Sequence, residues 1–222
     1  MTEHSDQATS DVPPRLELNG PAPDFEAITT HGPIQLSQWN PDKWVILFSH
    51  PADFTPVCTT EFMAFATLEA ELTKKNVVLL GNSIDSIHSH IAWVRNIKQN
   101  FDIDINFPII ADLDMKVAKL YGMLHKASSA TAAVRTVFFI DPARKLRAMI
   151  SYPLNVGRNF DEIVRVIDAL QTVDKHGVAC PANWRPGEKV IVPPPSTTKA
   201  AAERVADKSL EVTDWYFSKK SL

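Results

Sequence analysis

Cysteine is scarce in this sequence: among 222 residues only Cys58 and Cys180 occur, 122 positions apart. Two cysteines cannot build a disulfide framework or a structural zinc site, and these two do not form the Cys-x-x-Cys pair of dithiol exchange sites. Apart from His50, the histidines show no spacing typical of metal ligands. We therefore expect a reducing compartment and neither a metal nor another cofactor.

Long apolar runs and a surplus of basic charge are also missing. No apolar run approaches the roughly 18 residues that a membrane-spanning helix needs, and residues 1–15 lack the apolar core of a secretory signal. The net charge of −3 provides no basic footprint for nucleic acid or for an anionic membrane. These absences predict a cytoplasmic protein that binds neither nucleic acid nor membrane.

What is present is an ordinary globular composition, with 45% hydrophobic and 22% charged residues. The length suits one large domain, or one domain with an arm. We expect a polar, disordered tail over residues 1–15, a main domain over residues 16–172 and a proline-rich arm over residues 173–222. The arm ends near an aromatic cluster at residues 215–217. Such an arm is predicted to wrap over its own domain or over a partner subunit, which favours a homodimer.

The chain is organised around residues 44–72, where an apolar run is followed by a helical pattern. The run Trp44–Phe48 predicts a buried strand, and Phe62, Phe65, Leu68 and Leu72 repeat at helical spacing after it. Cys58 lies at the join.

The residues before Cys58 predict how this helix begins. Thr55 is expected to be the N-cap and Pro56 the first helical residue, so that the Thr55 hydroxyl caps the Cys58 N–H. The unpaired N–H groups and partial positive charge of a helix start favour the thiolate form, which is the reactive one. A lone cysteine can equally be a small buried hydrophobe, so this pattern alone leaves both interpretations open.

Strand and helix patterns alternate along the rest of the main domain. An N-terminal hairpin over residues 16–36 precedes them. The expected elements are strands at 77–84 and 107–110, helices at 87–97 and 114–123, a strand pair at 134–140 and 146–152, and a helix that begins at an Asn159 cap. This order indicates an open α/β sheet with helices on both faces. Reactive residues in such sheets gather beyond the carboxyl ends of strands, which is where Cys58 is placed.

A family resemblance rests on these same residues. Pro51–Cys58 has the pattern P-x-x-x-T-x-x-C of the peroxiredoxins, and the longer string Phe48–Glu61 resembles the one-cysteine, peroxiredoxin-6 type. Further segments between about residues 18 and 217 resemble that subgroup in order. The resemblance implies a thioredoxin-like α/β fold with an N-terminal hairpin and a C-terminal extension. It also implies an antioxidant enzyme that reduces hydrogen peroxide and alkyl hydroperoxides and is restored by an external thiol.

The resemblance also assigns candidate catalytic residues. Cys58 matches the peroxidatic cysteine, whose thiolate attacks a peroxide oxygen and becomes a sulfenic acid. Arg135 matches the family arginine, a fixed guanidinium that favours the thiolate and donates to the peroxide oxygens. Thr55 matches the threonine whose hydroxyl orients the peroxide, and Pro51 matches the proline that shields the pocket. Without the resemblance, Arg135 would be an ordinary ion-pair partner and Pro51 a strand terminator.

Three more residues are expected around this group. His50 matches a histidine of the subgroup. It is expected either to hydrogen-bond the cysteine sulfur or tune its environment, or to make only a structural hydrogen bond to the backbone. Glu61 and Arg158 are expected behind the catalytic residues, where an ion pair between them, or a contact from Arg158 towards Cys58, would hold the site in place.

Two departures from family patterns limit what the resemblance implies. Cys180 precedes a proline, as the resolving cysteine of two-cysteine members does, but its surroundings match the one-cysteine subgroup; Val212 and Ser218 stand where some microbial members have cysteines. A disulfide to Cys180 is therefore the less favoured route. The Gly-x-Ser-x-Gly pentapeptide of bifunctional members is absent, so we predict no phospholipase activity.

Two alternatives remain beside the peroxidase. The chain could be a redox sensor or a holdase-like chaperone, in which oxidised Cys58 signals or oligomers bind clients. It could also be a thioredoxin-like binding domain with an inert cysteine, which would leave the combination of Pro51, Thr55, Cys58 and Arg135 unexplained. The sequence identifies neither the physiological thiol nor the number of subunits, which could reach a ring of dimers.

Overall fold

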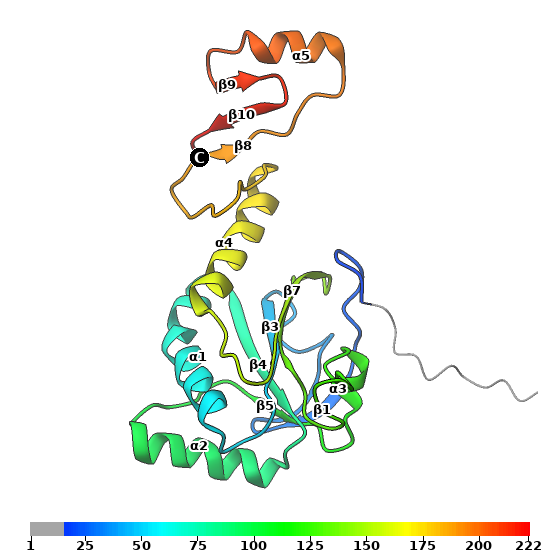
Figure 1. Ribbon diagram of the computed structural model, residues 1–222, viewed down its shortest axis with the longest axis vertical. Coiled ribbons are helices and arrows are strands. Elements are labelled where there is room, and N and C mark those ends of the chain that lie inside the picture. The colour runs from blue at the N-terminus through cyan, green and yellow to red at the C-terminus, as the bar shows by residue number, and fades with distance from the viewer. Residues whose placement is uncertain (1–15) are drawn as a thin grey trace, which may run out of the picture. The chain divides into compact units, whose positions relative to one another are not determined.

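A seven-stranded sheet forms the centre of the fold in the computed structural model, which describes residues 16–222 (Figure 1). The expected tail over residues 1–15 lies outside the described residues. The sheet order is β2-β1-β5-β4-β3-β6-β7. Its strands are β1 (Glu26–Thr29), β2 (Gly32–Gln35), β3 (Trp44–Ser49), β4 (Val77–Ser83), β5 (Ile109–Ala111), β6 (Arg135–Ile140) and β7 (Leu146–Tyr152). β3, β4 and β5 run parallel, and the other neighbouring pairs are antiparallel.

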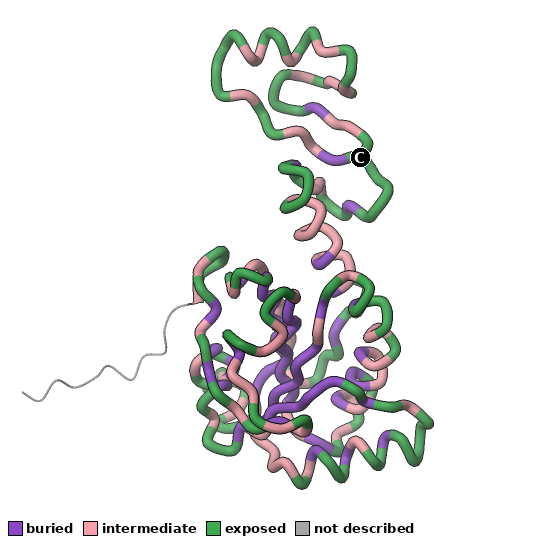
Figure 2. The backbone as a smooth tube through the Cα atoms, turned by 180° about the vertical axis from the view of Figure 1, so that it is seen from behind, coloured by how far each residue is buried: buried purple, intermediate pink, exposed green. Residues whose placement is uncertain are grey.

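Helices cover both faces of this sheet, as the alternating pattern predicted. They are α1 (Pro56–Lys74), α2 (Ile87–Phe101) and α3 (Lys116–Leu120). All six residues of β3 are buried, and successive side chains point to opposite faces. Val45 and Leu47 pack in one cluster with α3. Phe48 stacks on Phe65 of α1 at 4.0 Å between ring centroids. Figure 2 shows the burial concentrated along these central strands.

The helix expected at residues 114–123 is shorter than predicted. Met115 adopts a left-handed conformation with φ 58°, so the helix begins only at Lys116. The buried Asp112 carboxylate accepts the N–H groups of Val117 and Ala118 at 2.9 and 2.7 Å, which satisfies the first turn from outside the helix. Gly122, at φ 61°, follows directly after Tyr121 and stops the pattern.

Residues 159–222 form a second compact unit. It contains α4 (Phe160–His176), β8 (Val190–Ile191), α5 (Thr198–Val205), β9 (Glu211–Asp214) and β10 (Phe217–Lys220). Asn159 caps α4 as expected, because its Oδ1 accepts the Glu162 N–H at 3.2 Å. The sequence predicted a boundary between residues 172 and 173, which falls inside α4, whereas the compact units divide in front of α4. The three-stranded sheet β8-β10-β9 was not predicted. Over the described range, no helix combines the length and the apolar character that crossing a bilayer requires.

Candidate active site

Cys58 lies where β3 passes into α1, beyond the carboxyl end of the strand. It is the third residue of the helix and has no exposed surface. The capping prediction is wrong in one detail: Thr55 has the extended backbone of an N-cap, but its side chain makes no capping bond. The Thr55 hydroxyl instead donates to the Ala52 carbonyl at 3.0 Å, because the tight loop brings that acceptor within reach. The first turn of α1 therefore has no side-chain cap beside the sulfur.

Arg135 comes to the sulfur from the neighbouring strand. It is the first residue of β6, which pairs antiparallel with β3, so the start of β6 lies beside the end of β3. Arg135 Nη1 lies 3.4 Å from Cys58 Sγ, and both side chains are buried. Its Nε donates to the Leu154 carbonyl at 2.9 Å, which fixes the plane of the guanidinium. A fixed cation at this distance favours the thiolate over the thiol.

Glu61 holds Arg135 and Arg158 together one helical turn behind the cysteine. Its Oε2 lies 2.7 Å from Arg135 Nη1 and 2.8 Å from Arg158 Nη2. Its Oε1 accepts the backbone N–H and the Nε of Arg158 at 2.9 and 3.0 Å. Burial alone would raise the pKa of Glu61, but the hydrogen bonds and charge of Arg158, together with the charge of Arg135, hold it below its usual value. The carboxylate is therefore ionised in the folded protein.

Arg158 makes the expected ion pair with Glu61 but does not turn towards Cys58. Its Nη2 donates to the Ser49 carbonyl at 2.8 Å. Its guanidinium lies over the rings of Phe48 and Phe65, at 5.4 and 5.7 Å from the ring centroids. Arg158 thus ties the end of β3 to α1, and of these two arginines it is Arg135 that contacts the sulfur.

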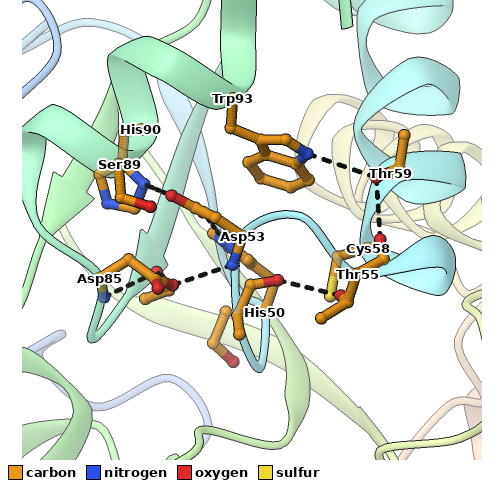
Figure 3. A network of polar contacts seen from close by, with 12 residues as sticks. His50, Asp53, Thr55, Cys58, Thr59, Asp85, Ser89, His90 and Trp93 are labelled. Carbon is orange, nitrogen blue, oxygen red and sulfur yellow. Dashed lines mark hydrogen bonds and ion pairs between the residues drawn. The ribbon is translucent and has the colours of Figure 1, made fainter. Parts of the chain in front are cut away.

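His50 belongs to a second polar group on the other side of the loop (Figure 3). Its Nε2 lies 2.9 Å from Asp53 Oδ1, and Asp53 Oδ2 lies 2.8 Å from His90 Nδ1. His90 Nε2 lies 3.1 Å from the Ile110 carbonyl. The hydrogen bonds and charges of both histidines outweigh burial and lower the pKa of Asp53 to about 2. Burial lowers the pKa of His50, although Asp53 opposes this. Among the contacts described for residues 16–222, the His50 side chain makes neither a bond to the cysteine sulfur nor a bond to the backbone.

The same three side chains could in principle hold a metal ion. One ligand atom from each of His50, Asp53 and His90 lies within 4.8 Å of the others. The contacts of 2.8 and 2.9 Å are, however, those of direct hydrogen bonds between nitrogen and oxygen. The arrangement fits a proton-bearing network as it stands.

Two further contacts connect α2 to the start of α1. Figure 3 shows Trp93 reaching from α2 towards Thr59, whose Oγ1 accepts from the indole Nε1 at 3.3 Å. Thr59 Oγ1 in turn donates to the Thr55 carbonyl at 2.8 Å. These bonds hold Thr55 next to the cysteine turn. Pro51, earlier in the same loop, is half-buried.

The structure brings together most of the predicted residues. Cys58, Arg135, Glu61 and Arg158 form one contact chain, and Pro51, Thr55 and His50 share the loop in front of Cys58. Sequence reasoning missed Asp53 and His90. Asp53 stands inside the quoted motif, and the helical spacing of His90 with Trp93 could have indicated a buried position.

Cys180 belongs to the second unit, where it is half-buried. Its Sγ lies 3.7 Å from the Ala169 carbonyl, and it packs beside Val178, Trp184 and Val190. Burial raises the pKa of the Cys180 thiol, although Arg165 opposes this. Both cysteines are free thiols.

Two family models match the chain. One, described as the AhpC/TSA family, matches residues 18–149, and the other, described as the C-terminal domain of 1-Cys peroxiredoxin, matches residues 169–208. Similar curated proteins include Peroxiredoxin 2 of Caldanaerobacter subterraneus, which is 53% identical over 207 residues and covers 93% of each chain. Peroxiredoxin of Aquifex aeolicus is 54% identical over 215 residues, which are 92% of this chain and 96% of the relative.

Solved structures with the same fold include two of particular relevance. A yeast mitochondrial 1-Cys peroxiredoxin superimposes with a TM-score of 0.84 at 42% identity, over 94% of this chain and 100% of the other. A cysteine-to-serine mutant of peroxiredoxin 6 of Arenicola marina gives a TM-score of 0.83 at 35% identity, over 93% of this chain and 98% of the other. These likenesses cover both compact units.

Proposed function

The chain belongs to the peroxiredoxin family, in its one-cysteine branch, and is a thiol-dependent peroxidase with a thioredoxin-like fold; from this premise we propose that Cys58 is the cysteine that reacts with peroxide. The observation that carries the proposal is the 3.4 Å contact between Arg135 Nη1 and Cys58 Sγ at the uncapped start of α1. The contact places a cation next to the sulfur, and the helix start adds backbone N–H groups that no side chain caps; both favour a thiolate.

The proposed first half of the cycle is a displacement at oxygen. The Cys58 thiolate attacks one oxygen of the peroxide, the S–O bond forms and the O–O bond breaks. The sulfur is oxidised to a sulfenic acid, and the leaving oxygen departs with the bonding electrons and takes up a proton as water or an alcohol. The Arg135 guanidinium and the Cys58 N–H are the proposed donors to the charge that develops on oxygen, and donors of this kind typically account for about 10²–10³ in rate.

Thr55 and Pro51 are proposed to shape the space for the peroxide. The Thr55 hydroxyl donates to Ala52, which leaves its lone pairs free to accept a hydrogen bond from a peroxide O–H. Pro51 has no N–H to compete for that position. Glu61 and Arg158 are proposed as positioning residues, because their contacts hold Arg135 and the end of β3 without touching the sulfur.

An external thiol completes the cycle. Its sulfur attacks the sulfenic acid, water leaves and a mixed disulfide forms; a second thiol then releases Cys58 as the thiol. The yeast relative is described as resolved through glutathione and thioredoxin systems, and we propose a reductant of that class here. Cys180 is a weak candidate for resolving the sulfenic acid, because burial disfavours its thiolate. The need for a thiol supply also favours a cytoplasmic location.

A homodimer is proposed as the working unit. β7 lies at one edge of the large sheet, and its Met149 side chain is exposed. The hairpin between β9 and β10 also exposes three adjacent aromatic residues, Trp215, Tyr216 and Phe217. An unpaired strand edge and an aromatic patch are both surfaces that proteins usually cover.

The test of the proposed function is peroxide consumption with dithiothreitol as the reductant. We expect Cys58→Ser to abolish turnover and Cys180→Ser to retain it. Intact mass after one equivalent of peroxide should show one added oxygen in the wild type and none in Cys58→Ser. Turnover retained in Cys58→Ser would refute the assignment.

A further inference from the structure

The reaction scheme above assigns no role to the ring protons in the hydrogen-bonded network of His50, Asp53 and His90. All three side chains are buried, and His50 and His90 have no exposed surface. They come from the loop after β3 and from α2, so the network connects two elements around the active-site loop. Its hydrogen-bond directions can be worked out from its acceptors.

His90 faces an acceptor at each ring nitrogen. A backbone carbonyl can only accept, so the 3.1 Å contact with Ile110 requires a proton on His90 Nε2. An ionised carboxylate can also only accept, so the 2.8 Å contact with Asp53 requires a proton on His90 Nδ1. The depressed pKa of Asp53, about 2, supports the ionised carboxylate. The His90 ring is therefore an imidazolium.

His50 presents the opposite arrangement. Its Nε2 faces the second oxygen of Asp53 at 2.9 Å and must carry a proton for the same reason. Its Nδ1 is buried and has no hydrogen-bond partner among residues 16–222. The ring is enclosed by Phe62 and Trp93, at 4.7 and 5.2 Å between centroids. The charged groups that act on His50 are Asp53, His90 and, less strongly, Asp85, whose carboxylate accepts the Asp53 N–H at 3.0 Å.

We propose that His90 is a positioning residue that carries both ring protons, neutralises Asp53, and thereby keeps His50 neutral with Nδ1 as an open hydrogen-bond acceptor. Without the charge of His90, the Asp53 carboxylate would draw a second proton onto His50, and Nδ1 would become a donor. His90 thus decides whether the loop before Cys58 presents an acceptor or a cation. We expect His50 Nδ1 to accept a hydrogen bond from an O–H of the bound peroxide or of the sulfenic acid, and this part rests on the proposed function. The protonation pattern of the two histidines does not depend on the proposed function.

The direct test is nitrogen NMR of the histidine rings in ¹⁵N-labelled full-length protein at pH 7. We expect His90 to show two protonated ring nitrogens, and His50 to show a protonated Nε2 and a bare Nδ1. A bare nitrogen on His90 would overturn the proposal. So would stoichiometric zinc in the purified protein, because a metal ligand at His90 Nδ1 cannot carry the proton.

Variants separate the charge of His90 from its shape. His90→Gln keeps an amide that can donate but removes the positive charge, and we expect the pKa of His50 to rise because the charge of His90 no longer opposes that of Asp53. In this variant the rate of Cys58 oxidation by hydrogen peroxide should fall as the pH is lowered, in a way that the wild type does not show. His88→Gln, at an exposed position two residues earlier on α2, is the matched control. It should change neither the protonation of His50 nor the pH dependence of Cys58 oxidation.

Asp53→Asn gives an independent test if His90→Gln does not fold. Removal of the carboxylate should make His90 lose one ring proton at pH 7. An unchanged His50 spectrum in folded His90→Gln, or a doubly protonated His90 in Asp53→Asn, would each contradict the proposal. The NMR readouts do not require any reaction of Cys58 with peroxide, so their failure is distinguishable from failure of the Cys58 assignment.

Discussion

At the scale of single residues, one guanidinium nitrogen of Arg135 contacts two other side chains. Arg135 Nη1 contacts both Cys58 Sγ and Glu61 Oε2, and Arg135 Nε is used by Leu154. Lysine would keep the charge but lose the planar fork that serves these partners together.

We therefore expect Arg135→Lys to reduce the rate of Cys58 oxidation by about 10²–10³. Stopped-flow mixing with hydrogen peroxide measures this rate. Arg147→Lys, on β7 beside Asp141, is the control and should react like the wild type. A rate for Arg135→Lys within threefold of the wild type would show that a positive charge alone suffices.

Glu61 is the residue whose loss should matter most for stability. Glu61→Gln leaves two buried guanidiniums without their carboxylate, and breaking a buried pair in this way costs about 3–5 kcal/mol. Urea unfolding should reveal this decrease in the free energy of unfolding. Glu162→Gln removes a partly exposed ion pair with Arg165 and should cost about 1 kcal/mol or less. Equal effects of the two substitutions would contradict the structural role of Glu61.

Asp53 predicts a pH dependence of stability. Its pKa of about 2 in the folded protein lies below its usual value of 3.8. Ionised Asp53 thus stabilises the fold above about pH 4, and this contribution, up to about 2 kcal/mol, is lost as the pH falls from about 4 towards 2. The difference in unfolding free energy between wild type and Asp53→Asn should shrink over that range. Asp104→Asn, at an exposed position, should show no such trend.

At the scale of elements, a substitution at the start of α1 is expected to change the reaction rate more than the stability of the fold. Because the Thr55 hydroxyl makes no capping bond, Thr55→Val should lower stability by less than a lost cap, which costs about 1 kcal/mol. The loss of one hydrogen bond to the peroxide, about 1.4 kcal/mol, should slow Cys58 oxidation roughly tenfold. Thermal unfolding and stopped-flow mixing measure the two effects. Thr60→Val, exposed on the same helix, is the control; a stability loss with an unchanged rate would contradict the assignment to Thr55.

The elements that could be predicted from the sequence are those with strong periodicity. β3 and α1 were placed correctly because a run of buried residues and a helical repeat identify them without reference to the rest of the chain. α3 was misplaced at both ends because an Asp112 carboxylate and a left-handed Met115 outweigh the helical pattern. The short strands β8–β10 contain too few residues for any alternation to be recognised.

At the scale of the whole molecule, the exposed aromatic hairpin of the second unit bears on assembly. If Trp215 and Tyr216 contact a partner chain, Trp215→Asp with Tyr216→Asp should weaken the homodimer by at least tenfold, since aromatic anchors dominate interfaces. Light scattering across a concentration series measures the dimer dissociation. Lys208→Glu, exposed in the same unit, is the control. A monomeric wild type would refute the homodimer, and an unchanged double variant would place the interface elsewhere.

The site also shows what a sequence cannot provide by itself. Cys58 was identifiable from its local setting, whereas Arg135 came only from the family resemblance, because 77 positions separate it from the cysteine. The pairing of Asp53 with His90 depends on how α2 packs beside the loop, and no spacing in the chain encodes that contact. Local signals thus made Cys58 a candidate, and tertiary packing supplied the groups that set its surroundings.

The sharing of Glu61 between Arg135 and Arg158 has a consequence for the order of events in the cycle. Two guanidiniums against one carboxylate leave one net positive charge beneath the sulfur. In the cycle proposed above, the Cys58 thiolate would balance that charge and the neutral sulfenic acid would not, so oxidation would restore the imbalance. We therefore expect the oxidised site to favour an anionic reactant, such as the thiolate form of the reductant.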